Sequence, residues 1–271
     1  MIDAAIQNYY ETRAEESRLT TGVCQLEAAR TKLLIEKHAP ASPAKVLDIG
    51  GAAGAYALWL AANGYTVHLL DAVGRLVEEA RRRSAHARFP LASCRVGDAR
   101  ELPFEDESAD IVLLLGPLYH LVAHADRARA LSEAARVLRT DGVLFVAAIS
   151  RWAAALDGVA RDLFSIPDHW SMVESGLPDG QHRNPTGRRG GFTTAYFHRP
   201  EDLRRELNES GFEVLDVCAI EGPAGFLPDF DERWVDPRQR ADMLRVAELL
   251  QSEPALLGAT PHLLGVGRVA R

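Results

Sequence analysis

Short apolar runs alternate with amphipathic segments through the first part of this 271-residue chain. The apolar runs have the length of strands, and the segments between them have the three-to-four-residue apolar spacing of helices. The expected strands are 45–50, 66–71, 94–98, 109–116 and 143–150. The expected helices between them are 55–64, 74–85 and 126–139. This alternation predicts an α/β fold with an open, doubly wound and mostly parallel sheet.

The alternation stops after residue 150 and resumes near residue 200. The segment between these points mixes aromatic residues, arginines, glycines and prolines, including Trp152, Phe164, Trp170, Arg183, Arg188 and Arg189. An insertion of this length in a compact domain is typical of a lid or binding element, or is disordered. A helix at 200–211, a strand at 212–220, a helix near 238–251 and a last strand at 262–270 then bring the number of expected strands to seven.

These boundaries predict four parts. Residues 1–44 are an N-terminal helical cover that contains a helix at 26–38, and residues 45–150 are the ligand-binding core. Residues 151–198 are an inserted cap for the substrate region, and residues 199–271 complete the sheet.

The composition and local sequence patterns argue against several classes of protein. The formal net charge of −7 disfavours a general nucleic-acid binder, which normally carries a basic balance. Three widely separated cysteines support neither a disulfide framework nor a zinc site. The N-terminus lacks the pattern of a signal peptide, and every apolar run is far shorter than a membrane span. We therefore expect a cytoplasmic protein without a nucleic-acid or membrane partner.

Acidic residues mark the ends of successive expected strands. In a doubly wound sheet, ligands bind beyond the carboxyl ends of the strands, and Asp48, Asp71 and Asp98 stand at three of these ends. The first is followed by a turn of small residues, GGAAG at 50–54, whose backbone N–H groups a ligand can approach closely. Each acid alone is equally consistent with a helix cap or a turn. Their recurrence at neighbouring strand ends favours a ligand site.

Five motifs together resemble one enzyme family. They read VLDIGGAAG, VHLLD, VGDARELPF, ADIVLLLGPLYHL and EAARVLRTDGVLFVA. In this order they resemble the class I S-adenosylmethionine-dependent methyltransferases, and most closely the small-molecule, type 11 subgroup that includes quinone-biosynthesis enzymes. The resemblance covers residues 45–150, and FHRPEDLRRELNESGFEVLDV matches the late helix and strand of the family. It implies a Rossmann-like sheet of seven strands with an antiparallel last strand. It also implies S-adenosyl-L-methionine as cofactor and S-adenosyl-L-homocysteine as product.

The resemblance assigns the first loop to the methionine end of the cofactor. The loop residues implied are Asp48, Gly50, Gly51 and Gly54. The family loop usually reads D-x-G-x-G-x-G, and here Ala52 occupies the position of the middle glycine. An alanine fits there if its φ is negative, so we interpret this loop as a variant.

The family pattern gives the following strand ends their own roles. Asp71 would bind both ribose hydroxyls, since a carboxylate only accepts hydrogen bonds and suits a vicinal diol. Asp98 would bind the amino edge of adenine. The backbone groups expected beside the cofactor belong to Ala72, Ala99, Leu115 and Gly116.

Methyl transfer is an in-line displacement that needs a closely aligned acceptor, and a base if the acceptor is a hydroxyl or a protonated amine. It needs no metal. His120 is the first candidate base, with Tyr119 beside it at the place where the family borders the transferred methyl group. A packing or capping role for His120 is an equal alternative. Weaker candidates in the cap are His169, His182, Tyr196 and His198.

The N-terminal cover offers further candidates. In related enzymes an N-terminal helix closes the site, and a Tyr or Arg there contacts the methionine carboxylate. Tyr10 and Arg30 are the candidates here, and Arg18 lies between them in the sequence. Burial of an aromatic ring explains Tyr10 nearly as well, and a solvated helix charge is the default explanation for Arg30.

The main rival class is an NAD(P) or flavin Rossmann oxidoreductase. The loop lacks the G-x-G-x-x-G spacing because residues 52 and 55 are alanines, and the chain has no Tyr-x-x-x-Lys pair. P-loop and G-x-S-x-G motifs are absent too. A degenerate, non-catalytic binding protein remains an alternative. We expect a monomer or homodimer that acts on a small acceptor with an apolar or aromatic body and an acidic group, while a peptide or protein acceptor stays open.

Overall fold

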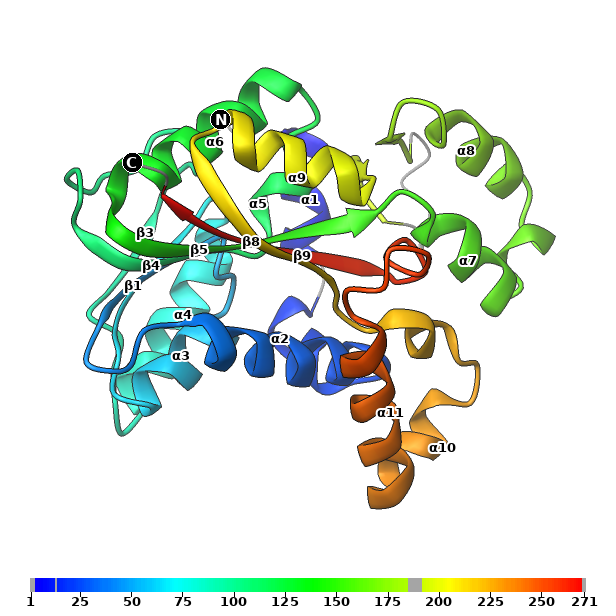
Figure 1. Ribbon diagram of the computed structural model, residues 1–271, viewed down its shortest axis with the longest axis horizontal. Helices are drawn as coiled ribbons and strands as arrows, with labels where there is room; N and C mark the ends of the chain where they lie inside the picture. Colours follow the sequence, from blue (N-terminus) through cyan, green and yellow to red (C-terminus); the bar gives the residue numbers. More distant parts are fainter. Residues whose placement is uncertain (1–2, 13, 185–191, 270–271) are drawn as a thin grey trace.

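The computed structural model describes residues 3–12, 14–184 and 192–269, and one twisted sheet runs through its centre (Figure 1). Its strands lie in the order β3-β2-β1-β4-β5, and β9 and β8 continue the sheet beyond β5. These strands are β1 (Lys45–Ile49), β2 (Thr66–Asp71), β3 (Ser93–Val96), β4 (Ala109–Leu114), β5 (Leu138–Ser150), β8 (Phe212–Ala219) and β9 (His262–Val269).

The strand directions confirm the predicted class of fold. Strands β1 to β5 pair in parallel, whereas β9 is antiparallel to both β5 and β8. The sheet is larger than predicted, because the described residues contribute nine strands rather than seven. The two additional strands, β6 (Gln181–His182) and β7 (Ala195–His198), come from the inserted segment, and β7 pairs with the end of β5. Both are too short for a periodic sequence signal.

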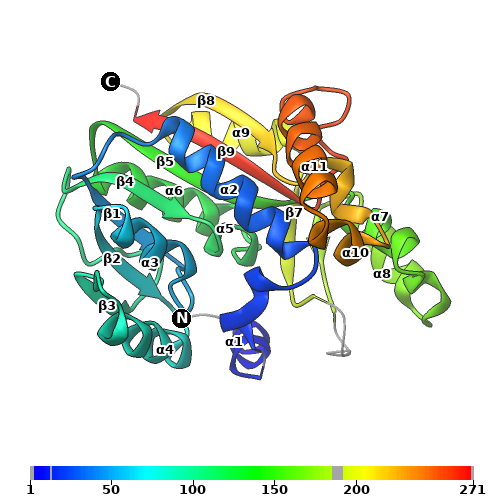
Figure 2. The ribbon, with the colours of Figure 1, turned by 90° about the horizontal axis from the view of Figure 1, so that it is seen from below.

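Helices cover both faces of the sheet. On one face lie α2 (Cys24–His38), α3 (Ala55–Ala62) and α4 (Gly74–His86), and on the other lie α6 (His124–Val137) and α9 (Pro200–Glu209) (Figures 1 and 2). Each layer has its own apolar core. One contains Leu34, Leu60 and Val77, and the other contains Leu131, Val137 and Leu203. The apolar strands are buried by both layers, which explains their unbroken hydrophobic runs.

Two helical pairs extend from the same end of the sheet (Figure 1). The inserted segment forms α7 (Ala153–Ala160), the turn η2 (Leu163–Ser165) and α8 (His169–Gly176), where the rings of Phe164 and Trp170 stack at 3.9 Å. The C-terminal part adds the turn η3 (Gly222–Phe226) and helices α10 (Phe230–Val235) and α11 (Pro237–Leu250). Two arginines that the sequence pattern singled out, Arg188 and Arg189, lie outside the described residues.

Three short elements close the carboxyl end of the sheet. Helix α1 (Ala4–Glu11) and the turn η1 (Glu15–Thr20) precede α2, and α5 (Pro117–His120) follows β4 directly. Arginines of α4 hold the first two in place: Arg75 donates to the carbonyl of Tyr10, and Arg83 donates to the carbonyl of Glu16. None of the helices in the described ranges is long and apolar enough to cross a membrane.

Candidate active site

A cavity of about 480 Å³ opens at the carboxyl ends of β1, β2 and β4, beneath α1 and η1. Its wall contains residues that are far apart in the sequence but were all predicted as site residues. These are Tyr10, Asp48, Gly50, Gly51, Asp71, Ala72, Asp98, Ala99, Leu115, Gly116, Tyr119 and His120. The topology thus brings most of the predicted site together at the switch point of the sheet, between β1 and β4.

Asp48 is an incompletely bonded acid in the cavity wall. It is 1% exposed, and its Oδ2 atom has no hydrogen-bond partner among the described residues. Burial and the neighbouring charge of Asp71 raise the pKa of Asp48 to about 7. A buried carboxyl without a partner is costly, so this atom points to a ligand that carries positive charge or N–H groups.

The turn after Asp48 has no room for side chains. A Cβ atom on Gly50 would lie 2.4 Å from the ring of Pro117, and one on Gly51 would lie 2.6 Å from Asp48 Oδ2. Gly50 also has a φ of +74°, which glycine adopts without strain. These glycines therefore keep the backbone of the turn accessible from the cavity.

Asp71 fixes the same turn from the neighbouring strand. Its Oδ2 accepts the backbone N–H of Ala52 at 2.9 Å, and its Oδ1 accepts that of Val73 at 2.8 Å. The φ of Ala52 is +47°, so the expectation of a negative value is wrong. Ala52 adopts the left-handed conformation that favours glycine, and the hydrogen bond to Asp71 holds the alanine in it. Burial raises the pKa of Asp71.

Asp98 lines the cavity but already has a cationic partner. The guanidinium of Arg100 binds both of its oxygens, at 2.9 and 2.6 Å, and also contacts Asp126 at 3.0 Å. The Arg100 hydrogen bonds lower the pKa of Asp98 far below its usual value. An adenine amino group would therefore share this carboxylate with Arg100. The arginine two residues after the acid is the sequence signal for this pairing.

Two predicted cofactor residues lie away from the cavity. Arg30 is 2% exposed, and it donates to the carbonyl of Ile220 and to the side chain of Gln251, so it joins α2 to the C-terminal part. The predicted role at the methionine carboxylate therefore gains no support, and the default explanation of a solvated helix charge is wrong because the side chain is buried. Gly54 precedes α3 with a φ of +83°, and a Cβ there would face Leu69 and Ala80. It shapes the turn from behind and does not line the cavity.

His120 and Tyr10 meet at the opposite wall of the cavity. The Tyr10 hydroxyl lies 2.7 Å from Nε2 of His120, and Nδ1 of His120 faces the Thr194 carbonyl at 3.5 Å. Burial lowers the pKa of His120 to about 4, so the ring is neutral at pH 7. A neutral ring that accepts from Tyr10 at Nε2 carries its proton on Nδ1. The expectation that Tyr10 meets the methionine carboxylate gains no support, because its hydroxyl is bonded to His120.

Aromatic rings pack around this pair. We call Tyr9, Tyr10, Tyr119, His120 and Phe192 the aromatic cluster. His120 lies 4.7 Å from Tyr119 and stacks on Phe192 at 5.6 Å, measured between ring centroids, and Tyr9 contacts Phe192 at 5.6 Å. The cluster joins α1, α5 and the end of the inserted segment. Only long-range packing creates the cluster, so no local sequence pattern indicates that Phe192 stacks on His120 or that Thr194 lines the cavity.

The other candidate bases in the cap lie away from the cavity. His169 packs on Phe164, and His182 stacks on Phe197 at 4.7 Å. His198 contacts Glu206 at 3.3 Å, and the Arg127 guanidinium that binds Glu206 lies 3.7 Å above the ring of Tyr196. Tyr196 and His198 thus join β7 to α6 and α9, whereas His169 and His182 pack within the inserted segment. The predicted role as a base therefore does not fit any of the four.

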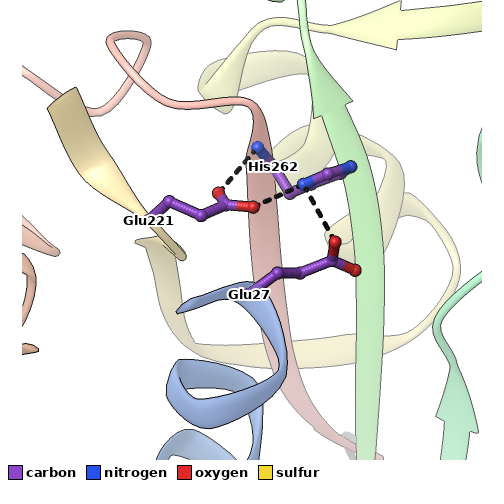
Figure 3. A group of neighbouring side chains, drawn as sticks. All are labelled: Glu27, Glu221 and His262. Atoms are coloured by element: carbon purple, nitrogen blue, oxygen red, sulfur yellow. Dashed lines mark hydrogen bonds and ion pairs between the residues drawn. The ribbon is translucent and has the colours of Figure 1, made fainter. Parts of the chain in front are cut away.

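A second cluster of charged groups lies behind η1. We call Arg18, Glu27, Glu221 and His262 the ion network (Figure 3 shows its two acids and the histidine). Arg18 binds both oxygens of Glu27 at 2.6 and 2.9 Å, and His262 Nδ1 lies 2.6 Å from Glu221 and 3.9 Å from Glu27. Burial opposes a charge on His262, but the two carboxylates raise its pKa to about 9. Burial likewise opposes the charge on Glu27, but Arg18 and His262 lower its pKa to about 2.

The ion network resembles a metal site in its residue types. One ligand atom from each of Glu27, Glu221 and His262 lies within 4.8 Å of the others. Arg18 already binds both oxygens of Glu27, and the protonated Nδ1 of His262 already donates to Glu221. The protein's own cations therefore fill the places that a metal ion would take.

Comparisons with known proteins find similarity to methyltransferases in the part of the chain that contains β1 to β4. Residues 47–146 match the family model described as a methyltransferase domain. Over 147 residues the chain is 30% identical to an uncharacterised methyltransferase of Mycobacterium tuberculosis, which covers 50% of this chain and 57% of that protein. Over 183 residues the chain is 29% identical to a ubiquinone biosynthesis O-methyltransferase of Rhizobium leguminosarum. These residues cover 67% of this chain and 64% of that protein. The chain thus spans less than two thirds of the length of these relatives.

One relative is named as a tRNA methyltransferase, and several solved structures share the fold of this chain. The probable tRNA methyltransferase 9B of Homo sapiens is 34% identical over 117 residues, which cover 43% of this chain and 23% of that protein. A methyltransferase structure from Methanosarcina mazei superposes with a TM-score of 0.60 at 17% identity, covering 88% of this chain and 97% of the other. The structure of the PH0226 protein of Pyrococcus horikoshii superposes with a TM-score of 0.61 at 16% identity, and the match covers 97% of this chain and 98% of the other. Residues 47–146 thus match a methyltransferase domain, and the chain shares its fold with a solved S-adenosylmethionine-dependent methyltransferase.

Proposed function

We propose that this protein transfers the methyl group of S-adenosyl-L-methionine to a small-molecule acceptor inside the cavity. The observation that carries the proposal is the pair of buried acids at the ends of β1 and β2. Asp48 keeps an unpartnered oxygen in the cavity wall, and Asp71 stands beside it at the next strand end. The accessible turn at Gly50 and Gly51 lies between them.

The charges of this wall fit the proposed cofactor. The methionine part carries an ammonium group and a sulfonium, and Asp48 offers a free acceptor next to the backbone of the turn. Asp71 stands where the family's ribose ligand stands, at the end of the second strand. Its oxygens keep lone pairs beyond the two backbone N–H groups they accept. When bound, the cofactor supplies a methyl group activated by the positive sulfur.

The enclosure of the cavity favours a small acceptor. Helix α1 and η1 contribute Ile6, Tyr10 and Leu19 to the wall, so the cavity is covered on the side of the N-terminal segment. The net charge of −7 also does not favour nucleic acid, which one relative's name includes as a substrate. A bulk tRNA substrate would need this cover to open.

Calorimetric titration with S-adenosyl-L-methionine, S-adenosyl-L-homocysteine and NADH tests the proposal. We expect micromolar affinity for the first two and none for NADH. Asp71→Ala and the milder Asp71→Asn should each weaken binding at least tenfold, while Asp157→Ala, on the exposed side of α7, serves as the matched control. Circular dichroism checks that the variants fold. Unchanged affinity in both folded Asp71 variants, or binding of NADH alone, would contradict the proposal.

A further inference from the structure

The hydrogen bond between Tyr10 and His120 joins two residues that are 110 positions apart in the sequence. Tyr10 comes from the N-terminal cover, and His120 from the short helix α5 after β4. Both side chains line the cavity beside Gly116, where the fold places the acceptor end of a methyltransferase site. The bond therefore connects the covering helix to the place of the proposed reaction.

The contacts of His120 define the direction in which it can take up a proton. The Thr194 carbonyl faces Nδ1, which leaves the Nε2 lone pair directed at the Tyr10 hydroxyl. A base whose second nitrogen is oriented by an acceptor is the usual arrangement in proton-transfer sites. Because Tyr10 occupies Nε2, a proton from a cavity ligand reaches His120 through the Tyr10 hydroxyl.

The surroundings of the pair indicate what kind of molecule it serves. Besides Tyr119, the neighbouring wall is formed by Leu121, Val122 and Pro117, which carry no charge. The charged side chains on the η1 side are already paired, since Arg18 binds Glu15 and Glu27. A wall in which apolar side chains surround the Tyr10–His120 pair and the Tyr119 ring suits a flat, uncharged ligand that has few polar groups. Of the cap's arginines that suggested an acidic group on the acceptor, Arg183 lies within the described residues, and it pairs with Asp179 and Gln181.

We propose that Tyr10 and His120 act as a proton relay for an acceptor with an acidic hydroxyl, namely a phenol or an enol. This inference rests on the proposed function. The acceptor oxygen forms a bond to the methyl carbon as the carbon–sulfur bond breaks, and the electron pair of that bond stays on sulfur. The acceptor proton passes to the Tyr10 oxygen as the Tyr10 proton passes to Nε2 of His120. The products are a methyl ether, the neutral thioether and a protonated His120.

The acidity of the acceptor follows from the strength of the base. Burial weakens His120 as a base, and proton transfer is efficient when the pKa values of donor and acceptor are close. An aliphatic alcohol is far too weak an acid for such a partner, whereas a phenol or enol is much nearer. A neutral amine would need no base before transfer, so the relay would have no function for it.

Three probes of similar shape distinguish the acceptor classes: 4-nitrophenol, 4-nitrobenzyl alcohol and 4-nitroaniline. Binding is measured on protein saturated with S-adenosyl-L-homocysteine, and methylation is measured as formation of that product from S-adenosyl-L-methionine. We expect the phenol to bind and to be methylated, and the alcohol and the amine to remain unmethylated.

Variants of the pair test the relay itself. His120→Gln should lower the methylation rate about 10² to 10⁴-fold and remove the fall in rate that the wild type shows as pH drops towards 4. Tyr10→Phe should lower the rate at least tenfold. Both should bind S-adenosyl-L-homocysteine as the wild type does. Tyr65→Phe is the matched control, because that hydroxyl bonds the Pro40 carbonyl away from the cavity.

Each outcome has a distinct meaning. Normal binding of S-adenosyl-L-homocysteine with no binding of the phenol, with methylation of the amine, or with unchanged rates in either variant would overturn the relay and leave the proposed function standing. Failure of the wild type to bind S-adenosyl-L-methionine and S-adenosyl-L-homocysteine would overturn the proposed function, and the relay with it.

Discussion

His120 and His262 are both partly buried and lie against carbonyl or carboxyl oxygens, yet the fold gives them different charge states. His120 has the neutral Tyr10 hydroxyl and the Thr194 carbonyl as partners, and its pKa falls to about 4. His262 lies between two carboxylates in the ion network, and its pKa rises to about 9. The same side chain is therefore a neutral acceptor at the cavity and a fixed cation behind it.

The acids follow the same division. Asp48 at the cavity lacks a positive partner among the described residues and has a raised pKa, whereas Glu27 in the ion network is bound by Arg18 and has a lowered one. Burial affects the acids of both regions, so the difference between their pKa values comes from their charged partners. Asp48 at the cavity thus keeps an acceptor for a ligand, whereas the groups in the ion network are saturated by one another.

The largest expected effect comes from breaking the ion network. Glu221 accepts from the His262 ring, the His262 backbone and Thr260, so Glu221→Gln leaves a buried cation without its closest carboxylate. We expect the free energy of unfolding at pH 7 to fall by about 3–5 kcal/mol. Denaturant unfolding measures it, and Glu213→Gln on the exposed side of β8 is the control. A loss equal to that of the control would show that the network does not stabilise the fold.

At the cavity, replacing an acid by its amide should raise the free energy of unfolding of the ligand-free protein, whereas in the ion network it lowers it. The pKa of Asp48 is about 7 in the folded protein against 3.8 ordinarily, so the folded state holds a proton that the unfolded state releases between these values. Stability due to this group is therefore lost as pH rises from 3.8 to 7. Asp48→Asn should make the ligand-free protein about 2–4 kcal/mol more stable at pH 8, with no gain near pH 4, while cofactor affinity falls. Destabilisation at pH 8 would contradict the assignment.

The pH dependence of unfolding should separate the two histidines. Since the folded pKa of His262 is raised, its contribution of about 3 kcal/mol is complete below pH 6.5 and is lost between pH 6.5 and 9. His120 has a lowered pKa, so its contribution is present above pH 6.5 and is lost as pH falls towards 4. His262→Gln should flatten only the alkaline side of the curve, and His120→Gln only the acidic side. Identical pH curves for the two variants would refute the distinction.

The smallest expected effect concerns backbone strain at the cavity. Ala52 adopts a φ of +47°, where a Cβ atom costs roughly 1 kcal/mol relative to glycine. Ala52→Gly should raise the free energy of unfolding by about 0.5–1 kcal/mol and preserve cofactor binding. Ala87→Gly, at the exposed end of α4 with a φ of −79°, is the control and should not stabilise. A destabilised Ala52→Gly variant would show that the turn is unstrained.

Sequence reasoning located the residues whose role depends on a strand end. Asp48 and Asp71 follow apolar runs directly, so the position of each acid in the fold is set by its own strand. Sequence reasoning failed for residues whose partner comes from a distant segment. Arg30 binds residues 220 and 251, and Tyr10 binds His120, contacts that no local pattern encodes. The ion network was missed for the same reason, because Glu27 and His262 stand at opposite ends of the chain.

The different charge states of His120 and His262 can be tested by nuclear magnetic resonance of the two rings, with and without S-adenosyl-L-homocysteine. Assignment uses His120→Gln and His262→Gln. Between pH 6 and 8 we expect a neutral His120 whose signals shift when the ligand is added, and a protonated His262 whose signals do not. Titration of both rings near pH 6.5, or a ligand response at His262 without one at His120, would contradict this expectation.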